Sequence, residues 1–192
     1  ILLDEPRGPD VTCFCSVCRA LCPDITDLQN FRRRSMLDFL GELFACVKRT
    51  DQDAKTSIVL LPQDLGMVDE IAQLTHLDTI GCHLFWQLLN EDVSMVEPWG
   101  RSVVEAARLH NKRSQLWFQN FHLDAEGEQS LDTTFSGLLR CDPDDVACYY
   151  YWRNNVDPES VWQTTRSLMR RIPRRQLHWQ THPRIPVPNV AG

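Results

Sequence analysis

Short apolar runs alternate with amphipathic segments along most of the chain, and this alternation limits the possible folds more than any other feature. The segments between the apolar runs carry apolar residues at three- and four-residue spacing, which predicts helices. Strand–helix units joined by short connections are typical of a parallel sheet. A doubly wound open sheet and part of a barrel share this pattern, so both remain possible. The strand-like runs lie near 1–3, 57–61, 78–82, 115–121 and 146–151, and the helical segments near 27–49, 67–74, 93–111, 127–140 and 158–172.

The length and composition of the chain predict a single core and exclude two classes of partner. With 192 residues, 43% of them hydrophobic, the chain can bury one sizeable core. We expect a domain over 1–176 and a proline-rich arm over 177–192. The net charge of −6 leaves no electrostatic footprint for nucleic acid. No apolar run approaches the roughly 20 residues that a membrane span needs.

Carboxylates follow the first two predicted strands. Asp4 and Glu5 come directly after the first apolar run, and Asp64 follows the second. In barrels of strand–helix units, catalytic side chains lie just past the carboxyl ends of the strands, so all three are candidates for catalysis, although solvated loop acids are also common there. Because neighbours on a strand face opposite sides, Asp4 and Glu5 are not expected to point into one cleft.

A cysteine-rich loop follows, and its spacing predicts a metal site. Cys13, Cys15, Cys18 and Cys22 lie within ten positions of one another. Closely spaced cysteines are typical zinc ligands, with Cys22 or a cysteine outside this chain as the fourth, and disulfides or plain thiols are the alternatives. Eight cysteines, half of them in this loop, favour a reducing compartment, so we expect a cytoplasmic location. The other four are expected to act as small hydrophobic residues.

Together these segments resemble a known family. Asp4-Glu5-Pro6, followed by the cysteines of 13–18, is similar to the fourth strand and following loop of clan A glycoside hydrolases, especially the zinc-bearing β-galactosidases and related bacterial glycosidase-like proteins. The resemblance implies that Glu5 is the general acid/base and that the cysteines bind structural zinc. It also implies an α/β fold that forms the C-terminal half of a TIM barrel, strands four to eight. The N-terminal half, or a partner chain, then has to complete the barrel.

Aromatic and polar residues near three strand ends are candidates for sugar binding. They are His83 and Trp86 after the third strand, Gln119 at the end of the fourth, and Trp152 and Arg153 after the last. Indole rings stack on sugars, and polar side chains bind hydroxyls, although each aromatic residue also fits a core position. We therefore predict a carbohydrate-active barrel, a glycoside hydrolase with Glu5 as acid/base. The alternative is a catalytically inactive, zinc-stabilised fragment that binds sugar or a partner. It arises because the segment 115–121, which corresponds to strand seven of the clan, ends in the amides Gln119 and Asn120 where the clan has its nucleophile.

Overall fold

Within the part of the chain that the structure describes, five parallel strands form one sheet and lie side by side in chain order. The structure, a computed structural model, describes residues 1–6, 13–149 and 154–172. A doubly wound sheet reverses its strand order once, so the unbroken order argues against that alternative, and the α/β class is confirmed. The strands are β1 (Leu2–Asp4), β2 (Ser57–Leu60), β3 (Thr79–Leu84), β4 (Arg113–Phe118) and β5 (Asp145–Cys148).

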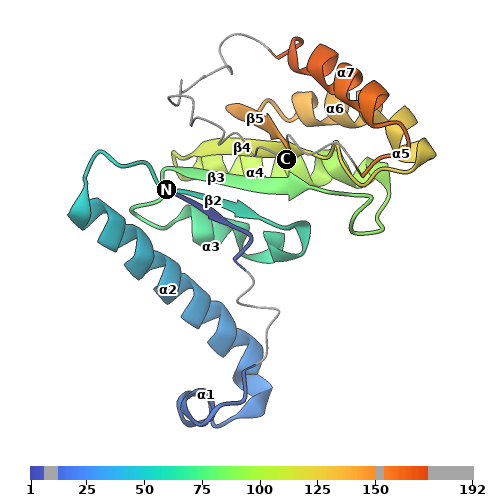
Figure 1. Ribbon diagram of the computed structural model, residues 1–192. Helices are drawn as coiled ribbons and strands as arrows, with labels where there is room; N and C mark the ends of the chain where they lie inside the picture. Colours follow the sequence, from blue (N-terminus) through green and yellow to red (C-terminus); the bar gives the residue numbers. More distant parts are fainter. Residues whose placement is uncertain (7–12, 150–153, 173–192) are drawn as a thin grey trace, which may run out of the picture.

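The helices lie between the strands in sequence, except the last helix, which follows the last strand, and four of them form one continuous layer. Helix α3 contacts α4, α4 contacts α6, and α6 contacts α7, while α4 also packs on β3 and β4 (Figure 1). The helices are α1 (Ser16–Leu21), α2 (Leu28–Thr50), α3 (Val68–Ala72), α4 (Val96–Leu109), α5 (Ala125–Gln129), α6 (Leu131–Arg140) and α7 (Pro158–Met169). Short 3₁₀ turns precede or follow them: η1 (Ile25–Asp27), η2 (Pro62–Met67) and η3 (Val93–Met95).

The strand register separates the two faces of the sheet. Leu60, Cys82 and Leu116 are aligned across three strands and are fully buried in the core that the helices cover. Side chains alternate between faces along a strand, so His83 and Trp117, which are also aligned, lie on the opposite face. The core therefore forms on one face, and polar and aromatic side chains gather on the other.

Helix α2 packs on the core through a narrow stripe. Its buried residues, Met36, Leu40, Phe44 and Val47, recur at intervals of four and three, which places them on one face of the helix. Its first two turns bury no residue, and α1 buries none either. Figure 1 shows α2 reaching away from the sheet, with α1 at its far end. No helix of the described ranges is long and apolar enough to cross a membrane.

Several boundaries differ from the sequence-based expectation; strand β4, for example, ends at Phe118 and not at Phe121. Strand β3 runs to Leu84 and not to Cys82, because His83 finds a partner for its ring inside the sheet. The helix expected over 127–140 is two helices, α5 and α6, which meet at Ser130. Asp4 lies within β1 and not after it. The arm predicted at 177–192 lies outside the described residues.

Candidate functional site

A fully buried histidine brings two carboxylates together at the carboxyl end of the sheet. The His83 imidazole is 0% exposed, and its Nε2 lies 2.7 Å from Oδ1 of Asp4 and 3.7 Å from Oε1 of Glu5. The carboxylates come from β1 and the residue after it, and the imidazole comes from β3. Residues far apart in the sequence thus meet because the strands between them are short and in register.

The backbone of Glu5 explains how two consecutive residues reach the same ring. Asp4 pairs with Val59 in the ladder, and the Glu5 amide donates a hydrogen bond of 3.0 Å to the Val59 carbonyl. Glu5 has φ of 43°, a left-handed conformation that is uncommon outside glycine. The expectation that Asp4 and Glu5 face opposite sides is therefore wrong, because that torsion ends the strand alternation between them.

Aromatic rings surround the histidine. The ring centroids of Phe85, Trp117 and Tyr149 lie 4.5, 5.2 and 5.7 Å from that of His83. Burial and the negative charges of Asp4 and Glu5 raise the pKa of Tyr149 to about 12. The phenol therefore stays protonated at neutral pH. We call these three rings, together with His83, Asp4 and Glu5, the His83 cluster.

Sequence reasoning missed Trp117 and Tyr149 as site residues. Both lie in aromatic runs at predicted strand ends, where an aromatic residue is equally consistent with a core position. The signal that places Trp117 beside His83 is the strand register, which the sequence alone does not specify. Tyr149 directly follows β5, next to the strand that carries Trp117, and the two ring centroids are 5.3 Å apart.

One of the two ring nitrogens of His83 has no hydrogen-bond partner among the described residues. Among the described residues, no group forms a hydrogen bond with the buried Nδ1 of His83. The 2.7 Å contact pairs Nε2 with the Asp4 carboxylate, which accepts a hydrogen bond when that nitrogen carries the proton. A ring held in this way can orient carboxylates and exchange a proton with them.

The other predicted site residues have different positions. Asp64 lies in η2, is 5% exposed, and lines a pocket beside α2 that no residue of the His83 cluster lines. Trp86 is 8% exposed and packs in the helix-side core, so its indole faces are not available to a sugar. Gln119 is buried, its side-chain oxygen accepts from the Gln87 backbone amide, and its side-chain nitrogen donates to the Phe121 carbonyl. Gln119 therefore stabilises the loop after β4. Trp152 and Arg153 lie outside the described residues.

A second, open pocket of about 520 Å³ lies among loops at the carboxyl ends of β3, β4 and β5. Gln87, His122, Asp124 and Asn154 are among its polar lining residues, and the Asn154 side chain lies 2.9 Å from Nε2 of His122. The ring of Phe121 joins this pocket to the His83 cluster, since its centroid lies 5.1 Å from Phe85 and 5.5 Å from His122. Amide and imidazole groups of this kind can bind hydroxyl groups.

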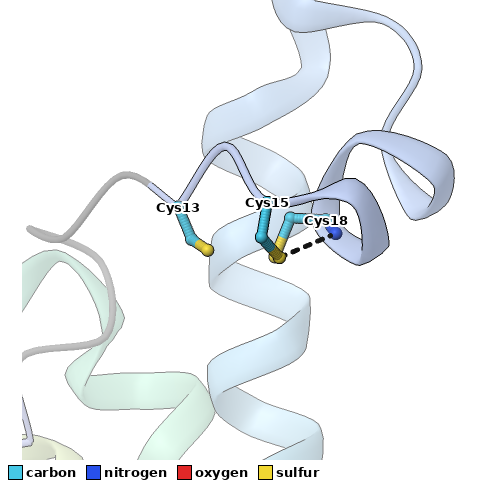
Figure 2. Close-up of side chains that lie close together, drawn as sticks. All are labelled: Cys13, Cys15 and Cys18. Atoms are coloured by element: carbon cyan, nitrogen blue, oxygen red, sulfur yellow. Dashed lines mark hydrogen bonds between the residues drawn. The ribbon is translucent and has the colours of Figure 1, made fainter.

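The cysteine loop forms a compact cluster of its own, beside α1. The sulfurs of Cys13, Cys15 and Cys18 all lie within 4.8 Å of one another, and these three residues could hold a metal ion. Figure 2 shows their side chains close together, with the Cys18 amide donating to Sγ of Cys15 over 3.5 Å. We call these three residues the cysteine cluster. Cys15 caps the N-terminus of α1, so the helix fixes the spacing between Cys15 and Cys18.

Hydrogen bonding shifts the pKa values of two thiols of the cysteine cluster in opposite directions. The backbone amide of Cys18 and the neighbouring thiols lower the pKa of Cys15 to about 7, and the hydrogen bond to Cys15 raises the pKa of Cys18 to about 11. The Cys22 thiol donates to the Asp24 carbonyl over 3.2 Å and does not join the cluster, so the expectation of Cys22 as fourth ligand has no support from its position.

No cysteine of this chain forms a disulfide; all eight lie in the described ranges. Cys82 and Cys141 are buried and Cys148 is half-buried, as expected for cysteines that act as small hydrophobic residues. Cys46 is exposed on α2, so that expectation is wrong for it, because it lies outside the buried stripe of the helix.

The chain was compared with protein-family models, with curated proteins and with solved structures. None of the three comparisons gave a match. The chemistry of the site therefore has to be argued from its own residues: a carboxylate pair on a buried imidazole, an aromatic wall, and three thiols that could bind a soft cation.

Proposed function

We propose that this chain is the C-terminal half of a barrel that binds and hydrolyses glycosides, with Glu5 as the general acid/base. The observation that carries the proposal is the convergence of Asp4 and Glu5 on the buried imidazole of His83. Glycoside hydrolysis needs a carboxyl group that donates and then recovers a proton, and a second carboxylate near it. In this proposal His83 is a positioning residue that holds Asp4 by the shorter contact and Glu5 by the longer one.

The surroundings of the carboxylates support a carbohydrate ligand. The rings of Trp117 and Tyr149 lie 5.3 Å apart, and both pack near the His83 ring that holds the carboxylates. Aromatic faces stack on the apolar faces of sugars. The neighbouring open pocket offers amide and imidazole groups. Which sugar binds, and whether the configuration is retained, depends on parts of the site that a completing half supplies.

The half-barrel proposal rests on the sheet. Parallel sheets are normally covered on both faces, and the described helices build one core on one face. Strand order within the sheet is that of consecutive barrel strands. A segment that pairs with β1 and β5 would close the barrel around His83 and Trp117. We also propose that the metal of the cysteine cluster is structural zinc, held by Cys13, Cys15 and Cys18.

The test is the Glu5→Gln variant of the complete protein that contains this chain, assayed on a panel of disaccharides and alkyl glycosides, whose leaving groups need a proton to depart. General acid/base catalysis contributes about 10²–10⁴-fold, so turnover should fall by that factor while binding of the free sugar is kept. The matched control is Glu42→Gln, on the exposed side of α2, which should leave turnover unchanged. Wild-type turnover in the Glu5 variant would remove Glu5 as the catalyst.

A second candidate function has its own observation. Gln119 and Asn120 follow β4, where the resemblance to clan A places the nucleophile, and both amides are bonded to backbone carbonyls, of Phe121 and Tyr149. An amide cannot form the glycosyl-enzyme ester. This favours a catalytically inactive barrel fragment, stabilised by zinc, that binds sugar or a partner. Saturable sugar binding with no hydrolysis of any glycoside in the panel would select it.

A further inference from the structure

A pocket between α2 and η2 is lined by Arg32. One edge of the Arg32 guanidinium has no hydrogen-bond partner among the described residues. The pocket has a volume of about 280 Å³ and lies between the first turns of α2 and the η2 turn. Its charged lining residues are Arg32, Arg33 and Asp64. It is distinct from the His83 cluster, none of whose residues lines it.

Two nitrogen atoms of the Arg32 guanidinium indicate the kind of ligand that would suit the pocket. Nε and Nη2 are both buried, and among the described residues neither has a hydrogen-bond partner. These two N–H groups lie on the same edge of the planar guanidinium, the edge that binds two oxygens of one anion side by side. A buried donor without a partner destabilises the folded state, and more so when it is charged, so an anion that binds both N–H groups would remove that penalty.

The neighbouring arginine shows that the local structure can neutralise such a charge. Arg33 donates to the Gly66 carbonyl over 3.0 Å and to the Glu70 carboxylate. Arg33 is thus a brace between α2 and the η2–α3 segment. Arg32, one position earlier on the helix, has no such partner at Nε and Nη2 among the described residues, and it lines the pocket together with Gln63.

We propose that this pocket binds a small oxyanion, a carboxylate or a phosphate monoester, and that the Arg32 guanidinium turns toward it, so that Nε and Nη2 leave their buried positions and form a bidentate contact with the anion. Its volume is slightly below the usual range for ligand pockets, so it fits a small anion or the anionic group of a larger molecule. Asp64, 5% exposed, places a negative charge in the same pocket. That carboxylate opposes the anion and limits its affinity, and this makes Asp64 a second handle for the test.

The experiment is a titration of the full chain with inorganic phosphate and, separately, with acetate, followed by ¹H–¹⁵N NMR of the arginine Nε–H signals. The anion that binds with the lower dissociation constant shows whether the pocket prefers a phosphate or a carboxylate group. Losing the bidentate contact should weaken its binding at least about tenfold in Arg32→Gln. Arg32→Lys should lose nearly as much, because an ammonium group keeps the charge without the two parallel donors. Asp64→Asn should bind more tightly than the wild type.

Arg49→Gln is the matched control, since Arg49 is exposed near the opposite end of the same helix. It removes the same charge and should leave both anion affinities unchanged. Thermal melting of each variant verifies folding. If Arg32→Gln does not fold, the Lys and Asn variants decide. The proposal is overturned if neither anion shows saturable binding, if Arg32→Lys binds like the wild type, or if Arg49→Gln loses as much affinity as the Arg32 variants.

Discussion

At the scale of single residues, backbone torsion and the absence of a side chain shape the site as much as the charged groups do. Glu5 reaches His83 only because its φ is positive. Gly81 lies two positions before His83 on the same strand face, and its backbone approaches β4 closely. A Cβ built at Gly81 would lie 2.6 Å from the Gln115 carbonyl oxygen. The close approach of β4 to β3, and with it the position of Trp117, therefore requires a residue without a side chain at position 81.

The first prediction at this scale is that Gly81→Ala destabilises the protein by about 1–3 kcal/mol, the usual cost of overpacking. The clash is with backbone, which cannot swing away as a long side chain can. Urea denaturation followed by circular dichroism measures the change. The control is Gly66→Ala in η2, where an added Cβ has no atom within 4 Å, so its stability should stay within about 1 kcal/mol of the wild type. Equal losses in the two variants would contradict the argument.

How much of the site could be predicted from the sequence also depends on such local details. Asp4, Glu5 and the cysteine cluster were found because their residue types and spacing carry chemical information. Their arrangement was not, since strand alternation predicts opposite faces for Asp4 and Glu5, and only the torsion of Glu5 brings them together. Trp86 and Gln119 follow strands as a ligand-binding residue would, and the structure buries both. Position relative to a strand end does not reveal which way a loop turns.

At the scale of elements, two equivalent braces join neighbouring strands at the amino end of the sheet. Thr56 and Asp78 exchange side-chain and backbone hydrogen bonds, with the Thr56 amide 2.9 Å from the Asp78 carboxylate. Ser114 and Asp144 do the same over 2.8 and 3.0 Å. Each pair fixes the start of one strand against the start of the next. The first brace also holds α2, because Lys48 forms a 2.7 Å ion pair with Asp78.

The ionisation of Asp78 gives this brace a pH dependence. Burial alone would raise the pKa of Asp78, but hydrogen bonds from Lys48 and Thr56, together with the Lys48 charge, hold that pKa below its ordinary value. A carboxyl group whose pKa is lowered by folding stabilises the protein above its unfolded pKa of about 3.9, and this contribution is lost as the pH falls through the folded pKa.

We predict that Asp78→Asn lowers the free energy of unfolding by about 1.5–3 kcal/mol at pH 7, the range for hydrogen bonds to charged groups. The difference from the wild type should shrink as the pH falls below about 3.9, because the wild-type carboxyl group then becomes neutral as well. Urea titrations at pH 7 and at acidic pH measure both values. Asp38→Asn, on the exposed side of α2, is the control and should change little. A difference that stays constant with pH would refute the role of the charge.

The elements themselves were largely predictable. All five strands and the long helices lie where apolar periodicity placed them, since a pattern that buries one face determines the type of element. Two errors have physical causes. Ser130 is both the C-cap residue of α5 and the N-cap residue of α6. The spacing of apolar residues continues across such a junction, so it does not reveal the break. Strand β3 passes through His83 because the carboxylate of Asp4 satisfies the ring inside the sheet.

At the scale of the whole molecule, the cysteine cluster is remote from the core. Helix α1 buries no residue, so little apolar surface stabilises the segment around it. A bound metal would supply the missing free energy there, because metal binding and local folding are coupled in structural sites. The sheet, by contrast, has its own core and needs no metal.

We therefore predict that the chain binds one zinc ion, and that a chelator loosens the cysteine loop without unfolding the sheet. Hydrogen exchange read by mass spectrometry should accelerate in peptides covering 13–24 and remain unchanged over β2 to β4. Cys15→Ser should lose most of the zinc measured by elemental analysis. Cys46→Ser, which removes an exposed cysteine of α2, should keep it. Equal zinc content in both variants, or faster exchange throughout the sheet, would reject a local structural site.

The short first strand has a further consequence for how such a protein fails on heating. Strand β1 has three residues, lies at the edge of the sheet and is largely exposed, and elements with these properties open at a lower free energy than the core strands. Its detachment would withdraw Asp4 and Glu5 from His83 while β2 to β4 stay folded. In this chain on its own, loss of the His83 cluster would then precede melting of the sheet, and pairing of β1 with a further strand would remove that difference.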